Sequence, residues 1–156
     1  MNSRTTETKR RFLWVDDHAE DTNENGLSLY IKHFKEDFEE IFRGAEIEII
    51  TAKNENEAID KLKISARTDG IILDLNLAGT ERDDYLNLLN TLCIDHPNIP
   101  LIALTNMSFP DVMKGALSSG AKAIFDRSRS KEEDGEIFSA YKLVAREMKK
   151  HLPEKI

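Results

Sequence analysis

The sequence predicts an α/β domain in which helices cover both faces of a parallel sheet. Short apolar runs alternate with helical patterns five times along the chain. Each run has the length and composition of a strand that is buried on both faces. Parallel strands need long crossovers, which the intervening helices supply in the usual right-handed sense. No repeat, low-complexity tract or Pro/Gly-rich linker divides the 156 residues, so we expect a single domain at 11–150.

The first half of the chain supplies two strands and two helices. Residues 1–10 are polar and are expected to form a flexible tail, followed by the first strand at 11–15. The second strand is expected around 47–50. Asn54 is a candidate N-cap for the next helix, with Glu57 at the capping-box position.

A long helical pattern within 23–44 lies between these two strands, with Gly44 as its end. A helix of about 20 residues is about 30 Å long, so it would extend beyond the sheet. Its apolar face leaves two interpretations open: the aromatic side chains belong to the core, or they form a stripe that binds a partner. These side chains are Phe34, Phe38 and Phe42.

The second half continues the alternation. The third strand is expected at 70–75, and a helix rich in leucine follows it and ends before Pro97. The fourth strand is expected at 100–105, a short helix at 110–119 and the fifth strand at 121–125. The last helix is expected at 132–150, with 151–156 as a C-terminal tail and with four side chains facing inward: Ile137, Tyr141, Val144 and Met148.

Acidic residues follow two of the apolar runs directly. Residues 12–15 lead into Asp16 and Asp17, and residues 70–73 lead into Asp74. The carboxyl ends of parallel strands share one edge of the sheet, where ligands bind in open α/β folds. Like charges held together raise one another's pKa, and a hard cation with oxygen ligands relieves the repulsion. The sequence therefore predicts an acidic metal pocket at this edge.

Composition narrows the classes of function. The chain carries 22 Lys and Arg against 29 Asp and Glu, a net charge of −7. This balance argues against direct binding of nucleic acid and against docking on an anionic membrane. No apolar stretch approaches the roughly 20 residues of a membrane span. Residues 1–10 contain no apolar segment, so they are not expected to act as a signal peptide. A lone Cys93 fits a reducing cytoplasm, where we expect the protein to reside.

Four segments in order resemble the receiver domain of two-component response regulators. They are 13–17, 71–76, 102–105 and 120–127, and the resemblance covers nearly the whole chain after residue 10. A single apolar run ending in an acid is common, whereas four in this order at predicted strand ends are specific. The resemblance implies a flavodoxin-like five-stranded sheet of order 2-1-3-4-5, here with an extended first helix, and an acidic pocket at the switch point.

The resemblance also implies chemical roles. Asp74 would be the phosphoacceptor, whose carboxylate attacks the phosphorus of a phosphohistidine. Asp16, Asp17, Asp74 and the backbone carbonyl of Asn76 would hold Mg²⁺ or another divalent cation. No reaction beyond this self-catalysed transfer is implied, so the chain is not expected to be an enzyme in the ordinary sense.

Two further residues would act on the phosphoryl group. The resemblance implies that the hydroxyl of Thr105 donates to one phosphoryl oxygen and that Arg127 pairs with another. Arg129 lies two positions further on and shares the parity of Arg127 along the strand. Arg127 could therefore be the surface residue and Arg129 the one that reaches the site.

Several positions depart from the family pattern. The family usually has Lys where this chain has Arg127, and Pro where it has Ser128. A guanidinium is planar and binds bidentately, whereas an ammonium is a compact point charge. Asn106 replaces a very small residue, and Ile124 stands where the family has a switching aromatic. These departures predict an unconventional signalling output.

Three functions are open on these grounds. The leading one is a stand-alone receiver that is phosphorylated on Asp74 by a histidine kinase or phosphotransfer protein. It then binds a downstream protein, and it could also form a homodimer. The second is a degenerate receiver that binds partners independently of phosphorylation. The third is a phosphatase of the haloacid dehalogenase type, which needs a second Asp two residues after the nucleophile, where this chain has Asn76.

Overall fold

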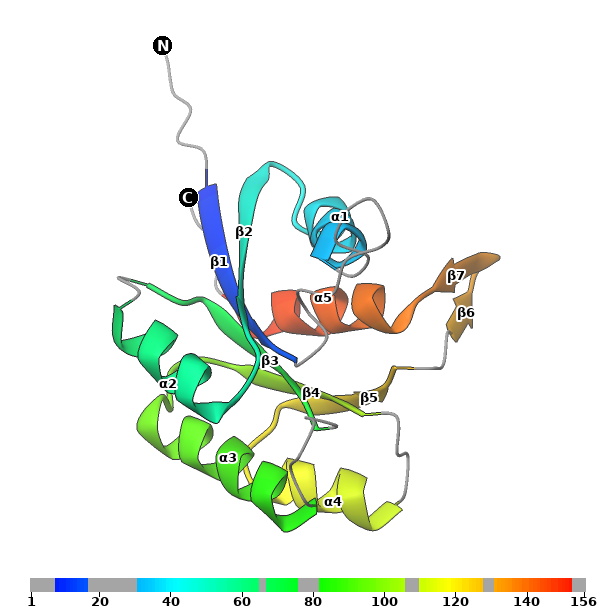
Figure 1. Cartoon of the computed structure of the whole chain (residues 1–156). Helices are drawn as coiled ribbons and strands as arrows, with labels where there is room; N and C mark the ends of the chain where they lie inside the picture. The colour runs from blue at the N-terminus through cyan, green and yellow to red at the C-terminus, as the bar shows by residue number, and fades with distance from the viewer. Residues whose placement is uncertain are drawn as a thin grey trace, which may run out of the picture.

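The computed structural model describes residues 8–16, 31–64, 67–75, 82–105, 110–127 and 131–152. A five-stranded parallel sheet of order β2-β1-β3-β4-β5 forms its centre, as predicted (Figure 1). The order reverses between β1 and β3, so the switch point lies where the sequence predicts the acidic pocket. The strands are β1 (Thr8–Val15), β2 (Ala45–Ala52), β3 (Gly70–Asp74), β4 (Leu101–Thr105) and β5 (Ala123–Asp126).

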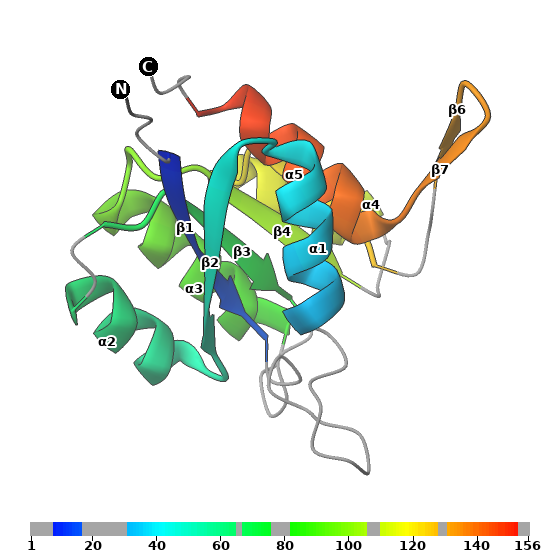
Figure 2. The same ribbon diagram turned by 90° about the horizontal axis from the view of Figure 1, so that it is seen from above.

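Helices cover both faces of the sheet and make a three-layer domain (Figures 1 and 2). One face is covered by α1 (Ile31–Ile41) and α5 (Ala140–Lys150). The other is covered by α2 (Glu55–Ile64), α3 (Arg82–Asp95) and α4 (Pro110–Ser118). Within the described part of the chain, no helix combines the length and the apolar character that a membrane span requires.

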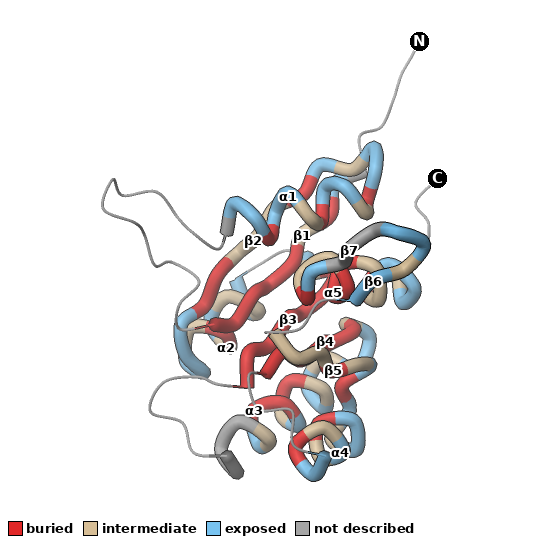
Figure 3. Tube along the Cα trace, turned by 90° about the vertical axis from the view of Figure 1, so that its right-hand side faces the viewer, coloured by how far each residue is buried: buried red, intermediate tan, exposed pale blue. Residues whose placement is uncertain are grey.

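The two faces of the sheet bury different kinds of side chain. The face under α2, α3 and α4 is aliphatic, and β3 and β4 are buried along their whole length (Figure 3). The face under α1 and α5 is largely aromatic and includes Phe12, Trp14, Phe34, Phe38 and Phe42. The alternation of side chains along each strand therefore sends successive residues into two separate cores.

The phenylalanines of α1 are expected either to belong to the core or to bind a partner, and their burial distinguishes the two. Phe34, Phe38 and Phe42 are all buried, and Phe38 lies edge-on to Phe12 with the ring centroids 4.8 Å apart. They belong to the core, and the partner-binding interpretation is wrong. The described helix begins at Ile31, so residues 23–30 of the expected longer helix lie outside the described residues.

β1 begins at Thr8, three residues earlier than expected. Residues 8–10 pair with 45–47 of β2 in continuous register, which extends the strand into the segment expected to be a tail. Arg10 is buried, and its guanidinium lies 5.8 Å from the centre of the Phe42 ring. Polar residues can form a strand here because the backbone N–H and C=O groups are hydrogen-bonded to β2, and this pairing does not depend on the side chains.

The start of the last predicted helix is wrong. Residues 131–138 form an antiparallel hairpin, β6 (Lys131–Glu133) and β7 (Glu136–Phe138), which projects from the body of the domain (Figure 2). Asp134 and Gly135 connect the strands with φ of 52° and 80°, and positive φ at both central residues is the requirement of a two-residue type I′ turn. α5 then begins after Ser139, whose hydroxyl accepts from the backbone N–H of Lys142 at 3.2 Å.

Candidate functional site

Four polar residues lie at the carboxyl edge of the sheet, one from the end of each of four neighbouring strands. Val15 and Leu73 are paired across β1 and β3, so Asp16 and Asp74 follow at the same level. Both carboxylates are about 1% exposed, and Thr105 at the end of β4 is fully buried. Of the predicted site residues, Asp17 and Asn76 lie outside the described residues, as does Arg129.

Arg127 joins this group from the end of β5. Its backbone N–H donates to the carbonyl of Thr105 at 2.8 Å, which fixes its place beside β4. Its Nη2 donates to Oδ2 of Asp16, and its Nη1 lies 3.2 Å from Oδ2 of Asp74. The guanidinium therefore bridges the two carboxylates. The prediction that Arg127 reaches the acidic pocket is consistent with this geometry.

The electrostatics of the site are dominated by this bridge. Burial by itself lowers the pKa of Arg127, but the charges of Asp74 and Asp16 outweigh burial and raise the pKa above its usual value. The guanidinium of Arg127 therefore stays positively charged. Its Nε is buried and makes no hydrogen bond to any described residue, so only part of its donor capacity is used.

The guanidinium also contacts one aromatic ring, that of Tyr141, which belongs to an aromatic cluster. The Arg127 guanidinium carbon lies 5.9 Å from the centre of the Tyr141 ring, within cation–π range. The Tyr141 ring is edge-on to Trp14, with centroids 5.9 Å apart, and to Phe34, at 5.4 Å. The sequence identified Tyr141 only as a core residue. Its place beside the site could not be found from helical spacing, because the contact is made across the domain.

The donor set fits a divalent cation. Asp16 and Asp74 place two carboxylates from adjacent strands side by side in a nearly water-free position, and hard cations prefer oxygen ligands. Among the described residues, no cluster of three or more potential ligands is present, and Asp17 and Asn76 are the residues expected to complete the set. In this structure Arg127 supplies the positive charge between the two carboxylates.

Ile124 occupies the position where the family pattern has a switching aromatic. It stands on β5 three residues before Arg127, and its side chain packs into the aliphatic core under α3 and α4. No ring is therefore available at this position to move with the site. Ser128 and Asn106 lie outside the described residues.

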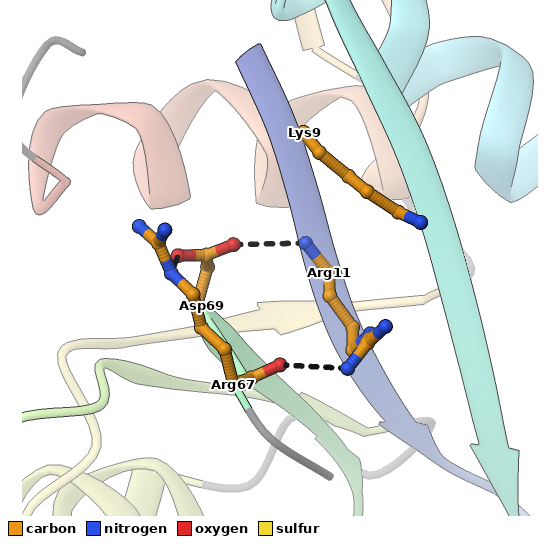
Figure 4. Close-up of a pocket in the computed structure, with 4 residues that line it drawn as sticks. All are labelled: Lys9, Arg11, Arg67 and Asp69. Atoms are coloured by element: carbon orange, nitrogen blue, oxygen red, sulfur yellow. Dashed lines mark hydrogen bonds and ion pairs between the residues drawn. The ribbon is translucent and has the colours of Figure 1, made fainter.

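A second polar group lies at the opposite, amino end of the strands. Lys9, Arg11, Arg67 and Asp69 line a cavity of about 250 Å³ (Figure 4). Asp69 accepts from the backbone N–H of Arg11 at 2.8 Å and from Nε of Arg67 at 3.0 Å, and Arg11 also pairs with Glu48. Because the arginines already have carboxylate partners, this group ties the start of β3 to β1 and offers no obvious chemistry.

The fold and the acidic edge together define the class of the domain: it has the fold of a response regulator receiver domain. No family model matches the sequence, and no curated protein is significantly similar to it. Many solved structures match instead. The signal receiver domain of a DNA-binding response regulator from Colwellia psychrerythraea 34H is 21% identical, with a TM-score of 0.63 over 90% of this chain and 96% of that one.

Two other solved structures extend the comparison. A response regulator from Thermotoga maritima superposes with a TM-score of 0.62 at 16% identity, over 92% of this chain and 97% of the other. A response regulator from Burkholderia pseudomallei, described with a phosphorylated aspartic acid, a calcium ion and citrate, is 24% identical, with a TM-score of 0.55 over 77% of this chain and 61% of that one. At these identities the likeness establishes the fold.

Proposed function

We propose that this protein is a receiver that accepts a phosphoryl group on Asp74 and thereby changes its binding to other proteins. The observation that carries the proposal is the meeting of Asp16, Asp74, Thr105 and Arg127 at the switch point of a receiver fold. The donor would be a histidine kinase or a histidine phosphotransfer protein in the cytoplasm. The neighbour described with a phosphorylated aspartic acid and a calcium ion supports both the modification and the binding of a divalent cation.

Each residue has a role that its chemistry suits. An oxygen of Asp74 attacks phosphorus, the new O–P bond forms as the N–P bond of phosphohistidine breaks, and the histidine nitrogen leaves with the electron pair. Asp16 and Asp74, with Asp17 and the carbonyl of Asn76, would hold Mg²⁺. When bound, the cation would neutralise charge on the transferring phosphoryl oxygens.

Thr105 and Arg127 would hold the product. Thr105 has a hydroxyl at the end of β4, and the hydrogen bond between its carbonyl and Arg127 keeps the two residues adjacent. A hydroxyl and a guanidinium can each donate to a phosphoryl oxygen, and such charge-assisted bonds are stronger than neutral ones. The reaction is the protein's own modification, so we propose no turnover of an external substrate.

Intact-mass spectrometry after incubation with acetyl phosphate and Mg²⁺ tests the proposal. The wild-type protein should gain one phosphoryl group, and Asp74→Asn should gain none. Asp95→Asn, which removes an exposed acid at the end of α3, is the control and should be modified as the wild type is. No mass gain in the wild type, or an equal gain in Asp74→Asn, contradicts the assignment.

The contacts of Arg127 with Asp16 and Asp74 also favour a second function, that of a degenerate receiver. The guanidinium of Arg127 compensates the charges of Asp16 and Asp74, and Ile124 provides no switching ring. Both features suit a degenerate receiver that binds its partner whether or not it is phosphorylated. If this second function holds, pull-downs with the wild type and with Asp74→Asn should recover equal amounts of the partner protein.

A further inference from the structure

Arg127 contacts both the two carboxylates at the carboxyl edge of the sheet and helix α5. Its terminal nitrogens contact Asp16 and Asp74, and its guanidinium faces the Tyr141 ring in the first turn of α5. We infer that Arg127 is an exchangeable counter-ion: a divalent cation enters only as the guanidinium leaves, and its departure is transmitted to α5 through Tyr141. The inference rests on the cation site of the proposed function.

The exchange follows from the atoms that each cation needs. The guanidinium uses Oδ2 of Asp16 and Oδ2 of Asp74, from the two strands that flank the switch point. A divalent cation held by the same two side chains needs oxygens from both carboxylates at about 2.0–2.6 Å. Two positive charges at one location also repel each other, most strongly where water is excluded. We therefore expect that Mg²⁺ binding displaces the guanidinium from these two oxygens.

Arginine is suited to this role by its shape. Two terminal nitrogens in a fixed plane can contact two carboxylates at once, whereas a single ammonium presents its charge at one atom. Nε of Arg127 is buried with no hydrogen-bond partner among the described residues, so the bridging position satisfies the side chain incompletely. An incompletely satisfied buried donor is costly, which favours release once another cation is present.

Tyr141 connects the guanidinium to the packing of α1 against α5. It is the second residue of α5, and its ring contacts both Trp14 and Phe34. The same turn is tied to α1, because the Ser139 hydroxyl donates to Asp37 at 3.3 Å. Departure of Arg127 removes the positive charge from the face of the Tyr141 ring. The packing of Tyr141 against Trp14 and Phe34 then changes, which is a response that Ile124, having no ring, cannot provide.

Mg²⁺ titration of the unphosphorylated protein, by calorimetry and by the fluorescence of the single Trp14, tests the exchange. Arg127→Gln removes the competing charge and should bind Mg²⁺ at least tenfold more tightly than the wild type. Arg146→Gln is the matched control. Arg146 in α5 also pairs with a carboxylate, that of Glu133 at 2.5 Å, but Glu133 belongs to β6 of the projecting hairpin and not to the acidic edge. Its affinity for Mg²⁺ should be unchanged.

The outcomes separate the inference from the proposed function. Equal or weaker affinity in Arg127→Gln overturns the counter-ion inference and leaves the cation site intact. Absence of binding in every variant overturns the cation site and the inference together. If Arg127→Gln folds only when Mg²⁺ is present, as followed by thermal unfolding with and without Mg²⁺, the metal has replaced the guanidinium and the inference is supported.

Hydrogen exchange of the backbone tests the transmission to α5. Mg²⁺ should change the exchange of residues 140–144 in the wild type and in Tyr141→Phe, which keeps the ring. In Tyr141→Leu the change should disappear, while calorimetry still detects Mg²⁺ binding. Persistence of the change in Tyr141→Leu shows that the signal reaches α5 by another route and overturns this part of the inference.

Discussion

Truncation of Phe38 to alanine probes the aromatic core that joins α1 to the sheet. The Phe38 ring is fully buried. It is edge-on to Phe12 at 4.8 Å and stacked with Phe34 at 4.7 Å and with Phe42 at 5.8 Å. Phe38→Ala therefore removes one ring that three others contact and leaves a cavity between α1 and β1.

The magnitude follows from that environment. Truncation of a buried phenylalanine costs about 3–5 kcal/mol, and aromatic pairs contribute about 0.5–1.5 kcal/mol beyond their area. Because Phe12, Phe34 and Phe42 would each be deprived of a neighbouring ring, we expect Phe38→Ala to fall in the upper part of the range, at about 4–5 kcal/mol. For a domain of this length each kcal/mol lowers Tm by about 2–4 °C, so Tm should fall by about 8–20 °C.

Urea and thermal unfolding, followed by circular dichroism and Trp14 fluorescence, measure this loss. Ile94→Ala is the control, because it truncates a large apolar side chain on α3 that is 66% exposed. Its free energy of unfolding should change by no more than about 0.5 kcal/mol.

Three results would refute the reasoning. A loss below about 1 kcal/mol in Phe38→Ala would show that the ring is not part of a close-packed core. A loss equal to that of Ile94→Ala would show that burial does not distinguish the two positions. If Phe38→Ala instead kept its stability and lost a binding partner, the aromatic stripe would be an interface after all.

Three further predictions follow from local contacts. The side chain of Asn54 caps α2, because its Oδ1 accepts a hydrogen bond from the backbone N–H of Glu57 at 2.9 Å. Asn54→Ala removes this cap and should lower the free energy of unfolding by about 0.5–2 kcal/mol. Gly120→Ala should destabilise more, because φ is +118° and a Cβ would lie 2.8 Å from Cβ of Cys93; urea unfolding measures both variants. Hydrogen bonds from Arg146, then Lys131, lower the pKa of Glu133 to about 2, so this contact contributes stability above the usual pKa of 4.5 and loses it as pH falls through 2. In Arg146→Gln an NMR titration should place the Glu133 pKa nearer its usual value, and an unchanged pKa would contradict the assignment.

The strands could be predicted from sequence because burial on both faces leaves a strong signal. Runs such as 101–105 are apolar at almost every position, and a run of four or five residues is too short for a helix. The same logic fails at 8–10, where polar residues extend β1 along the edge strand β2. There, pairing of the backbone decides the strand, and backbone pairing leaves no hydrophobic pattern.

Two local sequence signals conflict at the hairpin: a helical spacing of apolar residues and an Asp-Gly turn. Ile137, Tyr141, Val144 and Met148 recur at helical spacing, which predicts one continuous helix. Asp-Gly is a strong signal for a two-residue turn, and the structure follows that signal at 134–135. The spacing of Ile137 is therefore accidental, and only the residues from Ala140 onward belong to α5.

By itself the sequence determined the parallel sheet and the positions of Asp16, Asp74 and Thr105, because each follows or ends a buried strand whose direction fixes the edge that it reaches. Only the tertiary structure decided what Arg127 contacts. Its partners lie 111 and 53 positions away in the chain, and Tyr141 reaches it from a helix beyond the hairpin. Strand order and packing bring these groups together, and such long-range proximity has no counterpart in the spacing of residues along the chain.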